Sequence, residues 1–338
     1  GSMALSGSRD RWLTWAVRIV AVLVVCALAF FAYEVFQDRR QAQETSVTAR
    51  AIASLEQAVK DDPENPDAHI LLGDAYRDTG RPADAIDEYE TALELQADHP
   101  VALSGLALVA MQQEEWQTAS GYWERAIEVL ADMQFAAQDL RLEKAYYYYG
   151  ITLIELGEYE DAEEYLREAL RIKRSDADTH YALSVVYREL GSATKQRESL
   201  QNALMFVPTM PEANYDLGLL YLEDGDEASA AELFRVAVDY APGREEPLEA
   251  LEALGPFDER LEQAAALAES DPQAALGEAR IAAALEPTDI DAVRLVAQLL
   301  QQLDSPAEDQ KAAWEHVLDL VPDDPEATEA LQGLGSGS

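Results

Sequence analysis

The sequence predicts an all-α protein in which antiparallel helix pairs repeat along the chain, preceded by one helix long enough to cross a membrane. Three observations lead to this expectation. Small residues recur at a spacing of 34, glycines stand where the turns between paired helices are expected, and residues 12–36 form an apolar stretch. The expected fold is a right-handed α-solenoid tethered at its N-terminal side.

The composition excludes several classes of function. The chain has 338 residues, with 25 Lys and Arg against 65 Asp and Glu, for a net charge of −40. Nucleic acids and anionic lipid surfaces are polyanions, so neither is expected as a general partner. One cysteine excludes a disulfide framework and a cysteine-based zinc cluster. A hydrophobic content of 48% supports a packed core and excludes an acidic disordered chain.

The stretch Trp12–Phe36 predicts a transmembrane helix. Arg18 is the only charged residue between Trp12 and Tyr33. That length of helix spans roughly 33 Å, enough for a bilayer core of about 30 Å. Aromatic residues at both ends suit the membrane interfaces. The helix is therefore expected to anchor the protein as a single-pass membrane protein.

Basic residues on the two sides of this stretch predict its orientation. They are Arg9, Arg11 and Arg18 before it, and Arg39 and Arg40 after it. The side with more basic residues usually stays in the cytoplasm, and three against two favours the N-terminus inside. The C-terminal domain is then expected outside the cytoplasm, at the cytoplasmic membrane.

Two other interpretations of the apolar stretch remain open. A cleaved signal peptide ranks second, because more apolar chain follows the small residues around Ala29. A lipoprotein attached through Cys26 ranks third, because Val25 is larger than a lipidation signal requires. At the ends of the chain, Gly1-Ser2 is interpreted as a tag remnant and residues 335–338 as a linker.

Small residues recur at two fixed places in each of five units. The first set, spaced by 34, 43, 34 and 34, is Gly73, Ala107, Gly150, Ser184 and Gly218. Alanines follow 19 residues after each, at Ala92, Ala126, Ala169, Ala203 and Ala237. Bulky residues lie shortly before these alanines, at Tyr89, Trp123, Leu166, Leu200 and Phe234. Small residues let two helices approach closely, and the bulky residue fills the space beside the contact.

This pattern resembles the tetratricopeptide repeat family, whose unit is a 34-residue helix–turn–helix. Glycines at the expected turns fit the same unit, because a left-handed residue ends the first helix. These glycines are Gly80, Gly157, Gly191 and Gly225. The resemblance covers about residues 48–334, strongly to 244 and weakly after it. The five units are placed at 66–99, 100–133, 143–176, 177–210 and 211–244.

The remaining chain is divided around these units. Residues 1–11 form a tail, 12–36 the transmembrane helix, and 37–65 a helical connector with a half-repeat. Residues 66–244 hold the five units, and 245–334 hold degenerate pairs with a C-terminal cap. The insert at 134–142 is expected to lengthen the helices on both sides of it. Residues 245–257 break the period and are expected to join two subdomains.

The resemblance implies that the first helix of each unit lines a concave groove where partner peptides lie. Counted from the small residues, the groove side chains are expected to be Ile70, Leu108, Met111, Tyr147, Ile151, Ile154, Tyr181, Val185, Arg188, Tyr215, Leu219 and Leu222. An acidic column is expected beside them, at Asp78, Glu155, Glu189 and Glu223. An apolar stripe with an acidic border predicts a partner segment that is apolar with basic flanks.

Alternative interpretations of the groove remain open. The three tyrosines, spaced by 34, are expected to stack as a ladder, but they can equally pack between adjacent helices. The chain's own C-terminal pairs, or a second copy in a homo-oligomer, are other possible occupants. A clamp for chaperone C-terminal carboxylates is not expected, because the groove lacks that subclass's pattern of basic residues.

Catalytic chemistry is not predicted. His69 and His180 stand where the family places packing residues. The acidic segments Asp61–Asp67 and Asp323–Asp324 lack the ligand alternation of a calcium loop and are interpreted as helix caps. No phosphate loop, nucleophile elbow or dinucleotide fingerprint is present. We therefore expect neither enzyme activity nor a metal ion or cofactor.

These observations favour a membrane-anchored interaction scaffold or assembly factor. Its layout resembles bacterial envelope tetratricopeptide proteins that serve cytochrome c maturation, outer-membrane protein assembly, pilus biogenesis or periplasmic chaperone complexes. The alternative is a stoichiometric structural subunit of a larger membrane complex, in which the anchor itself packs against other helices.

Overall fold

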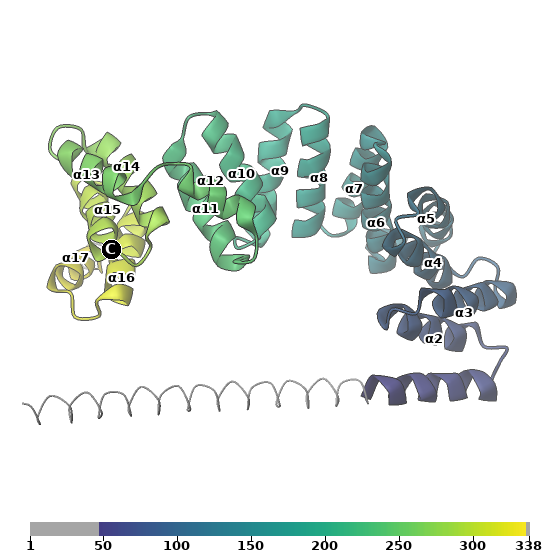
Figure 1. The fold of residues 1–338 in the computed structure, drawn as a ribbon. Helices are drawn as coiled ribbons and strands as arrows, with labels where there is room; N and C mark the ends of the chain where they lie inside the picture. Colours follow the sequence, from purple (N-terminus) through teal and green to yellow (C-terminus); the bar gives the residue numbers. More distant parts are fainter. Residues whose placement is uncertain (1–46, 336–338) are drawn as a thin grey trace, which may run out of the picture. The chain divides into compact units, whose positions relative to one another are not determined.

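The computed structural model describes residues 47–335, and all regular structure within them is helical (Figure 1). The chain divides into two compact units between Val129 and Leu130. The expected transmembrane segment 12–36 lies outside the described residues. Among residues 47–335, no helix is both long and apolar enough to span a bilayer.

The described part of unit one starts with a helix at residues 47–61. The helices that follow are α2 (Pro66–Asp78), α3 (Pro82–Leu95), α4 (Pro100–Gln112) and α5 (Trp116–Ala131), the last of which crosses the division. The first helix adds Ile52, Leu55 and Val59 to the core formed by α2, α3 and α4. The Tyr76 hydroxyl on α2 also donates a hydrogen bond to Glu56 at 2.9 Å. The expected half-repeat is therefore a packed helix of this unit.

Unit two continues the same alternation. Its first part contains the short 3₁₀ helix η1 (Ala136–Gln138), α6 (Leu140–Leu156), α7 (Tyr159–Ile172), α8 (Ala177–Glu189), α9 (Ala193–Phe206), α10 (Pro211–Glu223) and α11 (Glu227–Tyr240). The remainder contains α12 (Glu245–Glu252), α13 (Phe257–Leu267), α14 (Pro272–Leu285), α15 (Ile290–Gln302), α16 (Ala307–Leu320) and α17 (Pro325–Gly335). Helix pairs α6–α7, α8–α9, α10–α11 and α13–α14 pack together, as the repeat pattern predicts.

The small and bulky residues of the repeat meet inside each pair. Phe234 on α11 is fully buried, and a Cβ on Gly218 of α10 would stand 2.6 Å from its Cε1. Leu166 on α7 lies equally close to Gly150 on α6, where a Cβ would be 2.6 Å from its Cγ. At these two positions a side chain larger than hydrogen would displace the bulky residue, so Gly150 and Gly218 set the close spacing of their helix pairs.

The turns between paired helices confirm the predicted glycines. Gly80, Gly157, Gly191 and Gly225 have φ values of +74°, +77°, +67° and +82°. Two turns use other residues in the left-handed region, Glu114 at +58° and Asp304 at +48°. A left-handed residue thus follows the first helix in these six pairs, with or without glycine, whereas the turn between α13 and α14 contains none.

The acidic segments cap helices, as predicted. The Asn65 side chain accepts hydrogen bonds from the backbone of Asp67 and Ala68 at the start of α2. Asp324 accepts one from the Ala327 N–H at 2.9 Å at the start of α17. These bonds satisfy N–H groups that a helix leaves unpaired in its first turn.

The insert between α5 and α6 differs from expectation. The prediction that it lengthens both flanking helices is half wrong, because α5 ends at Ala131 and η1 interrupts the chain. Phe135, four residues after the end of α5, has a left-handed backbone (φ +68°) and directly precedes η1. The other half is correct, since α6 has 17 residues where α8 has 13.

The break in the period at residues 245–257 contains a helix that the sequence did not predict. This helix, α12, has eight residues where α10 has 13, and Gly255 ends the segment at φ +118°. In the regular repeats, α7 packs on α8 and α9 on α10. Here α11 packs on both α12 and α14. The shortened helix therefore brings the second helix of the next pair directly against α11.

Arg260 joins the elements at this break. Its side chain, 18% exposed, reaches Glu278 on α14 at 2.9 Å and Glu227 on α11 at 2.7 Å. Its Nε donates to the Leu254 carbonyl just after α12 at 2.8 Å. One guanidinium thus connects α13 with three other parts of the chain, and its fixed, branched geometry suits that arrangement.

Candidate partner-binding groove

The expected groove side chains of unit two lie on its first helices. Tyr147, Ile151 and Ile154 come from α6, and Tyr181, Val185 and Arg188 come from α8. Tyr215, Leu219 and Leu222 come from α10. The apolar and aromatic members are half-buried, and Arg188 is exposed. The apolar stripe is thus more covered than the sequence predicted, but it keeps accessible surface.

Unit one supplies fewer groove residues than expected. Leu108 and Met111 are half-buried on α4. The Met111 sulfur accepts a hydrogen bond from the Trp123 indole at 3.3 Å, so it also has a packing role. Ile70 was wrongly assigned to the groove, because it is only 4% exposed. It belongs to the core that the helix at 47–61 helps to build.

A buried carboxylate joins α8 to α10 in this groove. Asp216 accepts a hydrogen bond from the Tyr181 hydroxyl at 3.2 Å, and Arg188 lies 3.7 Å from the same oxygen. The Asp216 side chain is 13% exposed. Burial raises its pKa, against the opposing effects of Arg188 and Tyr181. The network fixes Tyr181 and Arg188 between neighbouring repeats.

Sequence reasoning missed Asp216. It stands one position beyond the tyrosine column, where the other units carry Leu71, Gly105, Tyr148 and Ala182. The available signal was an isolated acidic residue at an otherwise uncharged position of the repeat. An acidic residue buried between helices requires a partner, and Tyr181 and Arg188 provide it.

The three tyrosines do not form a mutual stack within the described part of the chain. The Tyr147 ring meets Tyr148 with centroids 5.1 Å apart, and Tyr215 meets Phe234 at 5.8 Å. Tyr181 hydrogen-bonds to Asp216 instead. Burial raises the pKa of Tyr147 to about 12. Each ring therefore packs within or between its own helices, as the alternative interpretation held.

The chain's own C-terminal helices contact one end of the groove. Tyr215, Leu219 and Leu222 on α10 pack against a core whose members include Leu251 on α12 and Ile281 on α14. This contact supports part of the alternative in which the chain covers its own groove. The side chains of α6 and α8 are therefore the better candidates for contact with a partner.

Exposed carboxylates stand at the C-terminal ends of the first helices. In unit two they are Glu155, Glu189 and Glu223, and in unit one Asp78 is likewise exposed. Glu189 pairs with Arg188 at 3.2 Å. Glu155 and Glu223 have no ion pair within residues 47–335. These two carboxylates are free to meet a basic group of a partner.

The histidines singled out by sequence have packing roles. His69 is 6% exposed, and its ring nitrogens lie 2.6 Å from Glu88 and 3.1 Å from the Pro63 carbonyl. The His180 ring stacks on Phe206 with centroids 5.7 Å apart. Within the described residues, no group of His, Cys, Asp and Glu side chains has the arrangement of a metal site.

These features define a class of protein, an α-solenoid of helix pairs with small-residue contacts and left-handed turns. Models of the tetratricopeptide repeat match residues 48–100, 98–175, 150–211 and 197–245. The matches together extend over more than half of the chain. The chain belongs to the tetratricopeptide repeat family.

Solved structures show similar folds at low sequence identity. YrrB, described as a TPR protein with an unusual peptide-binding site, is 20% identical, with a TM-score of 0.47 over 58% of this chain and 96% of YrrB. MamA is 23% identical, with a TM-score of 0.45 over 51% of this chain and 95% of MamA. PilF of Pseudomonas aeruginosa is 16% identical, with a TM-score of 0.46 over 81% of this chain and 97% of PilF. A search of curated proteins gave no match.

Proposed function

We propose that this protein is a membrane-anchored interaction scaffold that holds a partner segment along α6, α8 and α10. The observation that carries this proposal is the half-buried apolar row of these helices, bordered by the exposed Glu155, Glu189 and Glu223. Apolar groups that keep accessible surface gain free energy when a partner covers them. Exposed carboxylates beside them select a segment with basic flanks.

Membership in the tetratricopeptide repeat family supports the general activity, because such repeats commonly bind other proteins. Stacked repeats also create an extended surface suited to a linear segment. The identity of the partner does not follow from this surface. Its expected chemistry does: apolar side chains toward α6 and α8, and Lys or Arg toward the acidic row.

Reversing the charge of the two unpaired carboxylates is the direct test. In the double variant Glu155→Lys, Glu223→Lys, the protein is expected to capture its partner about three- to tenfold less well, since exposed charge pairs contribute about 0.2–1 kcal/mol each. Quantitative mass spectrometry of material purified in mild detergent measures the change. The matched control is Glu164→Lys, which changes an exposed residue of α7.

The outcomes of this experiment separate the proposals. Unchanged capture by the double variant would remove the acidic row from partner binding. Recovery of the same partner at a fixed ratio that resists salt would instead favour the structural-subunit alternative, because screening weakens contacts between exposed charges.

We also propose that residues 12–36 anchor the protein, with the helical domain outside the cytoplasm. The full chain is then expected to stay with membranes during alkaline carbonate extraction. External protease should degrade the helical domain in spheroplasts and leave a cytoplasmic marker intact. Recovery of the intact chain in the aqueous fraction would contradict the anchor, and protection from protease would reverse the orientation.

A further inference from the structure

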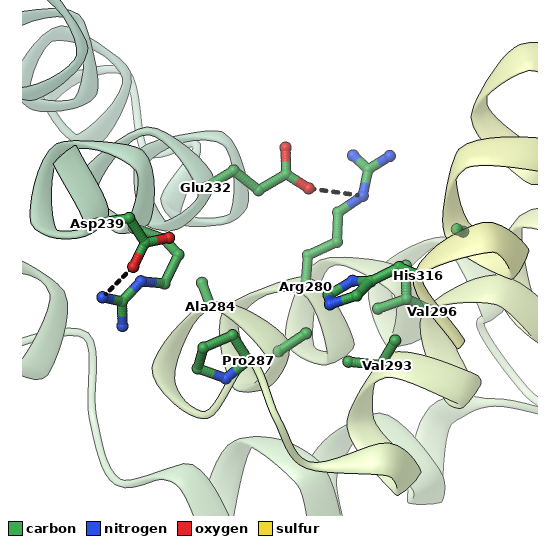
Figure 2. A pocket seen from close by; sticks show the side chains of 11 residues that line it. Glu232, Asp239, Arg280, Ala284, Pro287, Val293, Val296 and His316 are labelled. Atoms are coloured by element: carbon green, nitrogen blue, oxygen red, sulfur yellow. Dashed lines mark ion pairs between the residues drawn. The ribbon is translucent and has the colours of Figure 1, made fainter. Parts of the chain in front are cut away.

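Two cavities lie beside α11 in unit two. The first lies between α11, α14, α15 and α16, is open to solvent on one side and has a volume of about 320 Å³ (Figure 2). Its lining includes Ala284, Pro287, Val293 and Val296, together with Glu232 and Arg280. The second is a shallow, open depression between α9, α10 and α11 with a volume of about 500 Å³. Its lining includes Leu204, Met205, Leu217, Leu233 and Val236.

The first cavity arises where the repeat is interrupted. Because α12 is short, α14 packs directly on α11 and the next pair follows from there. The facing positions carry small side chains, among them Ala283, Ala284 and Ala313. Small side chains at a junction of helices leave space that larger ones would fill. The cavity therefore follows from the packing of α14 and its neighbours on α11 at this junction.

The second cavity carries an exposed, adaptable wall. Met205 at the end of α9 is 70% exposed, and the adjacent Phe206 and Val207 are 42% and 39% exposed. Methionine has an unbranched, flexible side chain that adjusts to different apolar surfaces. Met205 lines the cavity, and the two exposed apolar residues that follow it in the chain extend an apolar surface that favours contact with another chain.

Glu232 lines both cavities and marks the ridge between them. Its Oε1 lies 3.2 Å from Arg280 Nε, as the dashed line in Figure 2 marks, and its side chain is 52% exposed. Its second oxygen, Oε2, has no hydrogen bond within residues 47–335. The other guanidinium of the first cavity, Arg235, pairs with Asp239 at 2.7 Å. Glu232 therefore keeps one accepting oxygen directed to the surface.

The charges around Glu232 favour a cation. Partial burial against the cavity walls raises the pKa of the Glu232 carboxyl. The nearby Asp226 and Asp309 raise this pKa further, and Arg280 lowers it. Both arginines at the rim are already paired with carboxylates. An additional positive group would meet a net acidic surrounding and an oxygen without a hydrogen bond.

We propose that this ridge, formed by Glu232 and the two cavities beside it, is a second docking site for a partner segment with an apolar–basic–apolar order. One apolar side chain enters each cavity, and a Lys or Arg between them pairs with Glu232. The site uses α9, α11, α14–α16 and two side chains of α10, Leu217 and Tyr221, whereas the proposed groove uses other side chains of α10 together with α6 and α8. The chain then holds two segments at once, from one partner or from two.

The probe is a synthetic helical peptide with Leu, Lys and Leu at positions i, i+4 and i+7 in an Ala and Gln background, which places the three on one face. Binding to the full chain is measured by fluorescence anisotropy, beside a peptide with Glu in place of Lys. The Lys peptide is expected to bind saturably and at least about tenfold more tightly. Absence of saturable binding, or equal binding of both peptides, would overturn the proposal.

Substitutions assign the binding to this ridge. Glu232→Gln is expected to weaken binding of the Lys peptide about two- to fivefold, because the Glu232 side chain is half exposed, and Ala284→Phe, which places a larger side chain in the first cavity, is expected to weaken binding of both peptides. The control is Glu164→Gln, at the corresponding place on α7 two repeats earlier, which should leave affinity unchanged. If Glu232→Gln and Glu164→Gln weaken peptide binding equally, the Lys peptide is attracted by the overall negative charge of the protein, and the proposed site at Glu232 is wrong.

A second copy of the chain is the other possible occupant, and sedimentation distinguishes it. The full chain in detergent is expected to sediment with the same protein mass for the natural sequence and for Met205→Asp. If the natural sequence dimerises and Met205→Asp is monomeric, the ridge is a self-association surface and the proposed partner is wrong.

Discussion

Phe234→Ala is expected to lower the free energy of unfolding of unit two by about 3–5 kcal/mol. Phe234 is fully buried, packs beside Tyr215 and fills the space opposite Gly218. Alanine would leave a cavity that rigid helices cannot close completely. Urea unfolding followed by circular dichroism measures the change, because the midpoint falls in proportion to the lost stability.

The matched control for this prediction is Phe135→Ala. Phe135 is 70% exposed, so its loss is expected to change stability by less than about 0.5 kcal/mol. Because repeats contact mainly their neighbours, hydrogen exchange should speed up most in α8–α12 and least in α15–α17. Equal destabilisation by both substitutions would contradict the packing role assigned to Phe234.

Arg260→Ala is expected to lower the stability of the junction between α11 and α14 by about 2–3 kcal/mol. The substitution removes the contacts with Glu227, Glu278 and the Leu254 carbonyl at once. It leaves Glu278, which is 17% exposed, near apolar groups without its cation. Hydrogen exchange is expected to accelerate in α12–α14 before the rest of unit two.

Two further variants make the Arg260 result interpretable. Arg260→Lys retains the charge but not the branched donor geometry, and should recover only part of the lost stability. Arg171→Ala removes a pair with Glu168 whose arginine is 75% exposed, and should cost less than about 1 kcal/mol. If Arg260→Ala has no larger effect than Arg171→Ala, the junction is held by apolar packing alone.

The sequence was sufficient for the regular repeats because their determinants are local. Gly218 and Phe234 meet within one helix pair, and Gly157 and Gly225 end helices at fixed places. The same contacts and turns therefore recur in each unit at a spacing that can be read from the sequence. The turn glycines and the helix caps were confirmed for this reason.

The irregular features depend on contacts between distant residues. Arg260 and Glu227 are 33 positions apart, and no periodic signal connects them. Phe135 adopts a left-handed backbone that aromatic residues rarely show. Because residues 134–142 contain no glycine, the sequence contained no signal for this turn. The contact of α14 with α11, and the cavity that results, were not predictable from spacing.

The candidate groove was predicted in part. The spacing from the small residues predicted that Ile151 and Val185 lie on first helices, where both keep accessible surface. The prediction was possible because equivalent positions of successive repeats lie on the same face of their helices. The same count placed Ile70 in the groove, where the preceding helix makes it part of the core. It also passed over Asp216, whose role depends on Tyr181 and Arg188 of the neighbouring repeat.

Site-specific photocrosslinking tests the central claim most directly. A photoreactive phenylalanine analogue replaces Val185 on α8, or Glu164 on α7 as a control, in the full chain inside intact cells. The account predicts that Val185 yields a crosslinked partner, that Glu164 yields little, and that Glu155→Lys with Glu223→Lys reduces the Val185 product. Equal crosslinking from both positions, or a Val185 product that persists unchanged in the charge-reversed protein, would contradict it.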